Sequence, residues 1–253
     1  MLRGGAPILL ERAMSAAPRR GEVYDAIIVG GGPAGATAAL LLARAGWSVA
    51  LVEQSQFPRR KVCGEYVSAA SLPLLHALGV AGVFLVSAGP EIKRVGLFAE
   101  RAMLSAPMPP LTAAPQPWGR ALSRERLDAL LLQHAVRAGA HLWQPCKVTG
   151  VELACGVHRC RIVHRPTRDV IELRARLAIA AHGSWHAGAW PWLPEARTRG
   201  SDLLGFKAHF GGGSLPLDLM PMLVFPGGYG GMVHTDSGRV SLSCCVRRDQ
   251  LHK

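Results

Sequence analysis

The 253-residue chain is 49% hydrophobic, carries a formal charge of +12 at pH 7 and contains six cysteines. This composition predicts a globular protein with a buried core and excludes a disulfide scaffold, so we expect a reducing, cytoplasmic setting. The basic residues are mostly arginines in short, scattered clusters without interleaved aromatic residues, and we therefore expect no nucleic-acid partner.

Residues 1–21 contain one short apolar run and no small-residue cleavage site, which predicts a loose N-terminal tail rather than a signal peptide. The apolar stretch at residues 26–45 is interrupted by glycines and a proline where a strand should turn into a helix, so no transmembrane segment is expected. Peripheral contact with a membrane stays open, and the oligomeric state is not defined by the sequence.

Residues 24–29 form a continuous apolar run, residues 34–45 have helical composition, and residues 48–53 form a second apolar run. This order predicts a strand, a helix and a parallel strand. Further along the chain we expect helices at 71–78 and 123–139, an extended segment at 92–99, a proline-rich loop at 106–117, strands at 148–153, 159–164, 170–173, 177–181, 203–210, 222–225, 231–235 and 239–246, and a turn at 236–238.

Three glycines follow the first predicted strand with the spacing GxGxxG. Gly30 permits a tight turn, Gly32 lets the backbone approach a pyrophosphate, and Gly35 lets the helix pack against the strand. The anion is expected at the helix N-terminus, and Glu53, 21 residues after Gly32 at the end of the second strand, is expected to accept hydrogen bonds from a ribose. The same predicted dinucleotide site includes Pro33, Ala34 and Gln54.

Two further segments carry a family resemblance. FPRRKVCGE at residues 57–65 resembles the FPRxKxCGE segment of the geranylgeranyl-reductase-like branch of the FAD-dependent hydroxylase and monooxygenase superfamily, and RERLD at 124–128 is similar to a helix start of that superfamily. The resemblance implies FAD as cofactor, with Arg124 reaching its phosphates or ribityl chain, because a guanidinium offers paired donors to phosphate oxygens. It further implies cofactor contacts from Lys61, Cys63, Gly64, the backbone of Val148, and Gly183.

The fold class implied is α/β, a Rossmann-like FAD/NAD(P)-binding domain of the glutathione-reductase type with ββα layers, joined to a β-sheet substrate domain. We expect the FAD-binding domain to be discontinuous, at residues 22–88 and 118–184. The substrate domain is expected at 89–117 and 185–253 and to be incomplete, because relatives continue to a second Gly-Asp flavin motif that this sequence lacks.

The resulting functional hypothesis is a flavoprotein oxidoreductase whose FAD is reduced by NAD(P)H or another donor, such as an electron pool of quinone or ferredoxin type. The reduced flavin would then reduce a double bond or hydroxylate a small hydrophobic substrate, and Tyr229 is a candidate for lining the substrate pocket. Two alternatives stay open, a non-catalytic truncated dinucleotide-binding fragment and an NAD-dependent dehydrogenase. The resemblance places Cys63 and Gly64 near the reacting end of the flavin, although a buried inert cysteine at position 63 would fit the sequence equally well.

Other residues admit a structural interpretation. His182 and His186 lack a third ligand, so no metal site is predicted, and His182 stands where relatives have an aspartate. Cys244 and Cys245 are consecutive on a predicted strand and should point to opposite faces rather than form a redox pair. Ser123 is expected to cap a helix.

Overall fold

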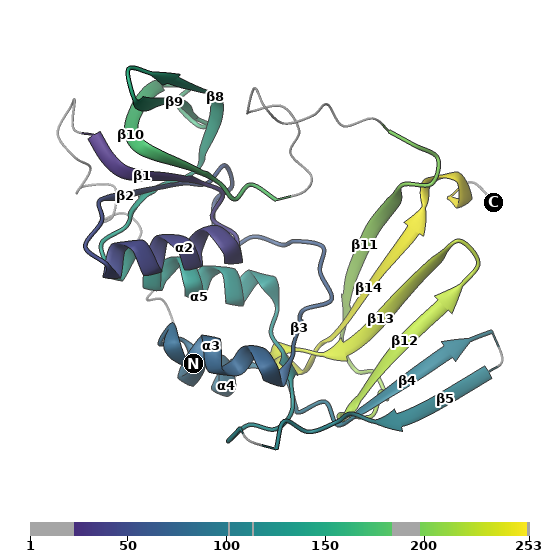
Figure 1. Cartoon of the computed structure of the whole chain (residues 1–253). Helices are drawn as coiled ribbons and strands as arrows, with labels where there is room; N and C mark the ends of the chain where they lie inside the picture. The colour runs from purple at the N-terminus through teal and green to yellow at the C-terminus, as the bar shows by residue number, and fades with distance from the viewer. Residues whose placement is uncertain (1–22, 101, 113, 184–197, 252–253) are drawn as a thin grey trace. The chain divides into compact units, whose positions relative to one another are not determined.

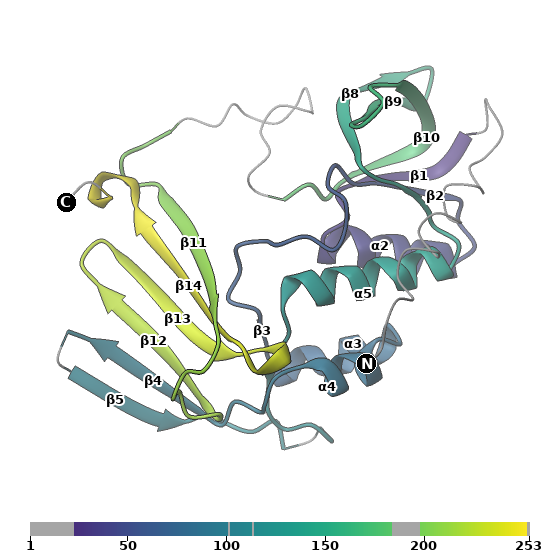
Figure 2. The ribbon, with the colours of Figure 1, turned by 180° about the vertical axis from the view of Figure 1, so that it is seen from behind.

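The computed structural model describes residues 23–100, 102–112, 114–183 and 198–251 (Figures 1 and 2). The chain divides into two compact units, unit 1 with residues 1–59 and 128–196 and unit 2 with residues 60–127 and 197–253. These two units are not the domains expected from the sequence, whose boundaries were placed at 88/89 and 117/118. The expected boundaries stay a prediction about which parts of the chain bind FAD and which bind substrate. The predicted tail and His186 lie outside the described residues.

Unit 1 is built on a six-stranded sheet in the order β7-β2-β1-β10-β9-β8. Its strands are β1 (Val23–Val29), β2 (Val49–Val52), β7 (His141–Trp143), β8 (Cys146–Ala154), β9 (Val157–His164) and β10 (Val170–Ala180). The pairs joining β7, β2, β1 and β10 are parallel, whereas β10, β9 and β8 pair antiparallel. Helix α2 (Pro33–Arg44) links β1 to β2 and packs against both, which confirms the expected strand-helix-strand unit.

The centre of this sheet is apolar because parallel strands are covered on both faces. Ile27 and Ile28 of β1 and Leu51 of β2 have no exposed surface. The residues at 170–173 and 177–181, expected as two strands, form the single strand β10. Two arginines interrupt the apolar run, but they alternate with the fully buried Ala175, which is the period of two that one continuous strand requires.

Unit 2 is built on a second six-stranded sheet in the order β11-β14-β13-β12-β4-β5. Its strands are β4 (Arg94–Ala99), β5 (Ala102–Pro107), β11 (Leu203–Phe210), β12 (Leu219–Phe225), β13 (Gly228–His234) and β14 (Val240–Arg247). A small sheet pairs β3 (Tyr66–Val67) with β6 (Arg120–Ala121), and the short helices are η1 (Ala69–Ser71), α3 (Leu72–Ala77), α4 (Ala81–Ser87), η2 (Asp236–Gly238) and η3 (Arg248–Gln250). Helix α5 (Arg124–Arg137) begins in unit 2 and continues into unit 1.

The sequence missed α4, β5 and the short strands β3, β6 and β7. Strand β5 is exposed along its whole length and ends in Pro107, so it shows no alternation of buried and exposed residues. Strands of two or three residues are too short to show a period at all. The turn expected at 236–238 is confirmed as η2, which connects β13 to β14.

Candidate functional site

The glycine turn after β1 has no room for side chains at two of its positions. Gly30 has φ +110°, and a Cβ there would lie 2.3 Å from the carbonyl oxygen of Ala181. A Cβ on Gly35 would lie 1.8 Å from the carbonyl oxygen of Gly30, so helix α2 approaches the turn as closely as its backbone allows. The backbone N–H of Gly30 donates to Val52 O at 2.8 Å, which ties the turn to the end of β2. Only glycine is compatible with this geometry.

The N-terminus of α2 is open to an anion. The helix starts at Pro33 with Gly32 at its N-cap, no side chain caps it, and its first turn contains no acidic residue. Ala34 in that turn is exposed. The turn lies at the carboxyl ends of β1, β2 and β10, and β2 and β10 flank β1 on opposite sides. Ligands of open α/β sheets bind at such a reversal of strand order, where unpaired N–H groups and the helix dipole favour a phosphate.

Glu53 is buried beside this turn, with 5% of its surface exposed. One carboxylate oxygen accepts the backbone N–H of Gly31 at 2.8 Å and the other accepts the backbone N–H of Ser55 at 2.8 Å. These bonds fix the carboxylate between the glycine turn and the segment after β2. Each oxygen keeps a further lone pair, so the group can still accept a hydrogen bond from a ribose hydroxyl.

An ion pair that sequence reasoning missed lies next to Glu53. Asp128 of α5 is fully buried, and its carboxylate lies 3.4 Å from Arg59 Nη1, while Arg59 Nε lies 3.9 Å from Glu53 Oε1. The guanidinium also stacks over the ring of Phe57 at 4.6 Å from its centroid. The sequence does contain one indication of this pair. Asp128 lies between Leu127 and a run of apolar residues on a helix, and an acidic residue buried in such a run requires a basic partner.

The remaining predicted residues of unit 1 occupy three places. The carbonyl of Gln54 accepts a hydrogen bond from Arg165 at 3.3 Å. Val148 lies on the edge strand β8 with its side chain in the core, which leaves only its backbone for a ligand. Gly183 has φ +83° and open space where a Cβ would stand. The structure therefore brings the glycine turn and Glu53 together, whereas the roles of these three residues stay predictions.

In unit 2, a buried carboxylate gathers two basic side chains. Glu65 Oε2 lies 2.9 Å from His209 Nε2, and Glu65 Oε1 accepts hydrogen bonds from Lys207 Nζ and, at 2.8 Å, from the backbone N–H of Arg124. Burial works to raise the pKa of Glu65, but these donors and the Lys207 charge hold the pKa below its ordinary value. The group is therefore a buried anion surrounded by donors.

The predicted residues Lys61, Cys63, Gly64 and Arg124 all adjoin this carboxylate in unit 2. Lys207 Nζ also donates to the carbonyl of Lys61 at 3.4 Å, and the half-buried Cys63 Sγ accepts the backbone N–H of Glu65 at 3.4 Å. The two sequence motifs thus meet at one side chain, because Glu65 ends the first motif and Arg124 begins the second.

The N-terminus of α5 is held by carboxylates from distant parts of the sequence. Besides Glu65 on the Arg124 N–H, Asp236 Oδ1 accepts the backbone N–H of Ser123 at 2.8 Å. Ser123 occupies the predicted capping position, and its carbonyl accepts the first helical N–H groups, including that of Leu127 at 2.9 Å, but its buried hydroxyl has no hydrogen-bond partner within the described residues. The acceptors for the N-terminal N–H groups, however, come from the loop before β3 and from η2, a tertiary arrangement that a local capping pattern cannot predict.

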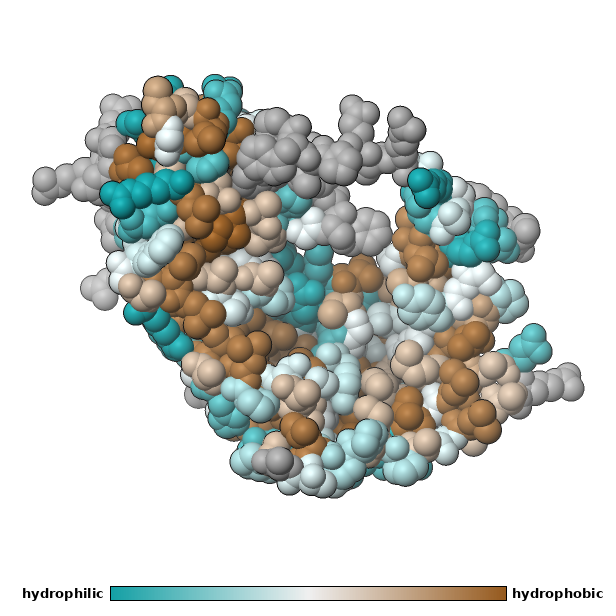
Figure 3. Space-filling model, viewed as in Figure 1, coloured by the Kyte–Doolittle hydropathy of each residue, from teal (hydrophilic) through white to brown (hydrophobic). Residues whose placement is uncertain are grey.

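One face of the unit 2 sheet runs from a charged end to an apolar end. Lys207 pairs with Ser243, and the paired row continues through Gly231, Met222, Leu97 and Leu104. Side chains at paired positions share a face, here called the Lys207 face. On this face Leu97 and Leu104 at the far end, Val224 on β12 and Tyr229 on β13 are exposed. Figure 3 shows hydrophobic side chains gathered around β12, β4 and β5.

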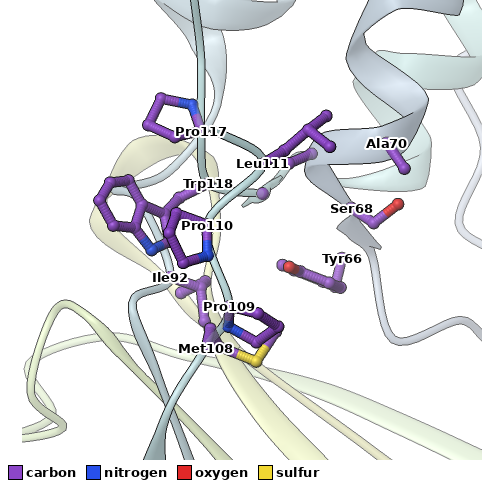
Figure 4. Close-up of a pocket in the computed structure, with 12 residues that line it drawn as sticks. Tyr66, Ser68, Ala70, Ile92, Met108, Pro109, Pro110, Leu111, Pro117 and Trp118 are labelled. Carbon is purple, nitrogen blue, oxygen red and sulfur yellow. The ribbon is translucent and has the colours of Figure 1, made fainter. Parts of the chain in front are cut away.

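Unit 2 also contains a separate apolar cavity of about 360 Å³. Tyr66 and Ser68 lie on one side of it, and Pro109, Pro110 and Trp118 lie on the other (Figure 4). Burial raises the pKa of the Tyr66 hydroxyl. None of the predicted cofactor residues lines this cavity.

Comparison with known proteins identifies the class of this site. Residues 23–188 match the family model described as "FAD binding domain", and the chain belongs to that family. It is 30% identical over 164 residues to menaquinone reductase of Mycobacterium tuberculosis, covering 63% of this chain and 38% of that protein. It is also 30% identical over 195 residues to digeranylgeranylglycerophospholipid reductase of Thermoplasma volcanium, covering 72% and 45%. The chain thus spans less than half of these two relatives, and the predicted resemblance is confirmed.

Solved structures show the same fold. The chain superposes on a myxobacterial chondrochloren halogenase with a TM-score of 0.78 and 22% identity, covering 91% of this chain and 54% of the other. A geranylgeranyl bacteriochlorophyll reductase-like protein from Thermoplasma acidophilum gives 0.76 and 23%, covering 92% and 58%. At this identity the likeness confirms the predicted α/β fold class, in which an FAD-binding domain is joined to a second β-sheet.

FAD, the cofactor of this family, fits the residues present. The glycine turn has no side chain to block a pyrophosphate, the α2 N-terminus offers unpaired N–H groups, and Glu53 stands at the end of the neighbouring strand. Within the described ranges no cluster of three His, Cys, Asp or Glu side chains is arranged to hold a metal ion. Of the helices in the described part of the chain, none has both the length and the apolar character to span a bilayer.

Proposed function

We propose that the chain is the FAD-binding and substrate-sheet part of an oxidoreductase that acts on a hydrophobic substrate in the cytoplasm. The observation that carries the proposal is the glycine turn, where Gly30 and Gly35 leave space only for backbone at an uncapped helix N-terminus. The family match over residues 23–188 supports FAD over other dinucleotides. The six free cysteines suit a reducing compartment.

In this proposal the cofactor is held by residues from both motifs. The α2 N-terminus, with Gly32, Pro33 and Ala34, receives the pyrophosphate, and Glu53 accepts a ribose hydroxyl. The other proposed cofactor contacts come from Gln54, Lys61, Cys63, Gly64, Arg124, the backbone of Val148, and Gly183. The FAD-binding domain would comprise residues 22–88 and 118–184, with the substrate domain at 89–117 and 185–253.

The Lys207 face supports a hydrophobic substrate. Leu97, Leu104, Val224 and Tyr229 are exposed along it, and apolar area of this kind gains free energy when a nonpolar molecule covers it. The names of two relatives point the same way, since one reduces a menaquinone and the other a digeranylgeranylglycerophospholipid. We therefore propose that the substrate is a lipid-like or aromatic molecule that lies against this face.

Bound FAD would supply the redox chemistry, taking up electrons from NAD(P)H or another donor and passing them to a substrate double bond or to oxygen. The chain's own residues would hold the cofactor and orient the substrate. The relatives include reductases and the structural neighbours include a p-nitrophenol 4-monooxygenase from Pseudomonas putida, so reductase and monooxygenase activity are both proposed. An NAD-dependent dehydrogenase is disfavoured, because the chain enters unit 2 after β2, and the strands β8 and β9 that it later adds to the unit 1 sheet pair antiparallel instead of forming further parallel strand-helix units.

The test is FAD affinity, measured by quenching of flavin fluorescence on titration with the 253-residue protein. Glu53→Gln places an amide NH₂ against one of the two N–H groups that the carboxylate now accepts, and we expect about tenfold weaker binding. Glu152→Gln, an exposed carboxylate on β8 of the same unit, is the matched control and should bind like the wild type. Equal affinity in all three proteins would refute the role of Glu53, and no binding to the wild type would refute the proposed function.

A further inference from the structure

Glu65 connects the two motifs through contacts that sequence comparison alone does not reveal. It has φ +63° and its side chain is fully buried, although it belongs to a loop. Its carboxylate bonds to the first N–H of α5 and to two side chains of β11, Lys207 and His209, which are 142 and 144 residues away in the sequence. Burying a carboxylate without such partners would cost much free energy. The Glu65 carboxylate, the Arg124 N–H, Lys207 and His209 therefore form one hydrogen-bonded cluster.

The residues just before Glu65 lie on the same stretch of sheet. Val62 packs against Gly205, because a Cβ added to Gly205 would lie only 2.9 Å from Val62 Cγ1. A Cβ added to Gly64 would lie 3.6 Å from the Ser243 hydroxyl oxygen. Gly205, Lys207 and His209 are alternate residues of β11 and therefore share the Lys207 face. The segment at residues 61–65 thus lies on one face of β11 and β14, and the Glu65 carboxylate at its C-terminal end bonds to Lys207 and His209 of β11.

We infer that Glu65 is a positioning residue, which fixes Cys63, Gly64 and Arg124 in a single arrangement. Its carboxylate holds the α5 N-terminus through the Arg124 N–H, and its own backbone N–H is donated to Cys63 Sγ. Lys207 reinforces the arrangement by bonding to both the carboxylate and the Lys61 carbonyl. The role of this arrangement in cofactor binding rests on the proposed function. The role of Glu65 in holding Cys63 in place is independent of the proposed function.

The test measures thiol labelling of each cysteine in the cofactor-free, full 253-residue protein, by alkylation with iodoacetamide and peptide mass spectrometry. Glu65→Gln removes the negative charge that Lys207 and His209 surround, and it should weaken the attachment of residues 61–65 to β11. We therefore expect iodoacetamide to label Cys63 at least about fivefold faster, which is the change expected from weakening one charged hydrogen bond. The buried Cys146 and Cys160 and the exposed Cys155 should keep their rates, because they lie in unit 1.

Lys207→Met is the second variant, since it keeps the bonds from His209 and Arg124 to Glu65 and removes the bonds from Lys207 to the Glu65 carboxylate and to the Lys61 carbonyl. It should accelerate Cys63 labelling by a smaller factor. Glu91→Gln, a partly exposed carboxylate paired with Lys93 and Arg120 in the same unit, is the matched control and should leave the Cys63 rate unchanged.

Unchanged Cys63 labelling in both Glu65→Gln and Lys207→Met would overturn the inference, and so would a uniform rise at all six cysteines in both, because that pattern indicates general destabilisation. FAD titration of the same proteins adds a second readout, with about tenfold weaker binding expected for Glu65→Gln. If the wild type binds no FAD, the proposed function fails, while the labelling rates still decide whether Glu65 positions Cys63.

Discussion

Replacing Asp236 with asparagine removes a charge that anchors the start of α5 while leaving the side-chain shape unchanged. Asp236 is 2% exposed, and its carboxylate accepts the Ser123 N–H at 2.8 Å, the Thr235 hydroxyl at 3.1 Å and Arg239 Nη2 at 2.7 Å. Burial works to raise its pKa, but hydrogen bonds from Ser123 and Arg239 and the Arg239 charge lower the pKa from 3.8 to about 2.

The size of the effect follows from that shift. One pKa unit corresponds to about 1.4 kcal/mol, so the ionised form of Asp236 contributes at most about 2.5 kcal/mol to the free energy of unfolding. The partner arginines, Arg239 and Arg126, have side chains that are 29% and 54% exposed, and solvent screening reduces the contribution to about 1–2 kcal/mol. For a protein of this size that corresponds to a fall in Tm of about 2–8 °C.

Thermal unfolding followed by circular dichroism at several pH values is the assay. Because the folded-state pKa of Asp236 is below the unfolded-state pKa, the stabilisation is fully present above about pH 4 and is lost as the pH falls through about 2. The Tm difference between wild type and Asp236→Asn should therefore be largest near neutral pH and shrink in acid. Asp218→Asn, which breaks an exposed pair with Arg94, is the control and should leave Tm close to wild type. A Tm difference that is absent at pH 7, or that grows in acid, would show that the Asp236 charge does not stabilise the folded protein.

The Gly35→Ala variant should fold less stably and bind FAD at least about tenfold more weakly, since its Cβ would stand 1.8 Å from the carbonyl oxygen of Gly30. Denaturant unfolding and flavin titration would check this, and wild-type behaviour in both would contradict the close approach. Burial raises the pKa of the Cys146 thiol to about 11 and that of Cys160 to about 12. At pH 8 both should resist alkylation while exposed Cys155 reacts, and rapid labelling of Cys160 in the native protein would show that its burial is wrong.

The first part of unit 1 could be predicted because local signals agree there. Apolar runs, helix formers and the glycine spacing all point to the same strand-turn-helix, and Gly30 and Gly35 then occupy positions that only glycine can fill. The prediction was less accurate where alternation was masked, as in β10, where Arg174 and Arg176 interrupt a run whose inward residue is Ala175. Exposed edge strands such as β5 give no pattern to detect.

The candidate site shows a similar division. The glycine turn and Glu53 form a local signature within one strand-helix-strand unit, so their spacing was sufficient. The ion pair of Arg59 with Asp128 and the cluster of Glu65 with Lys207 join residues 69 and 142 positions apart, which no local pattern encodes. Such pairs become visible only when the fold shows which charges are buried together.

FAD binding is tested by the absorbance spectrum of the purified 253-residue protein after incubation with FAD and removal of the excess, with the released cofactor identified after denaturation. We expect a flavin spectrum with close to one FAD per chain. A colourless protein that takes up no added FAD would contradict the assignment of the glycine turn, Glu53 and the α2 N-terminus to the cofactor.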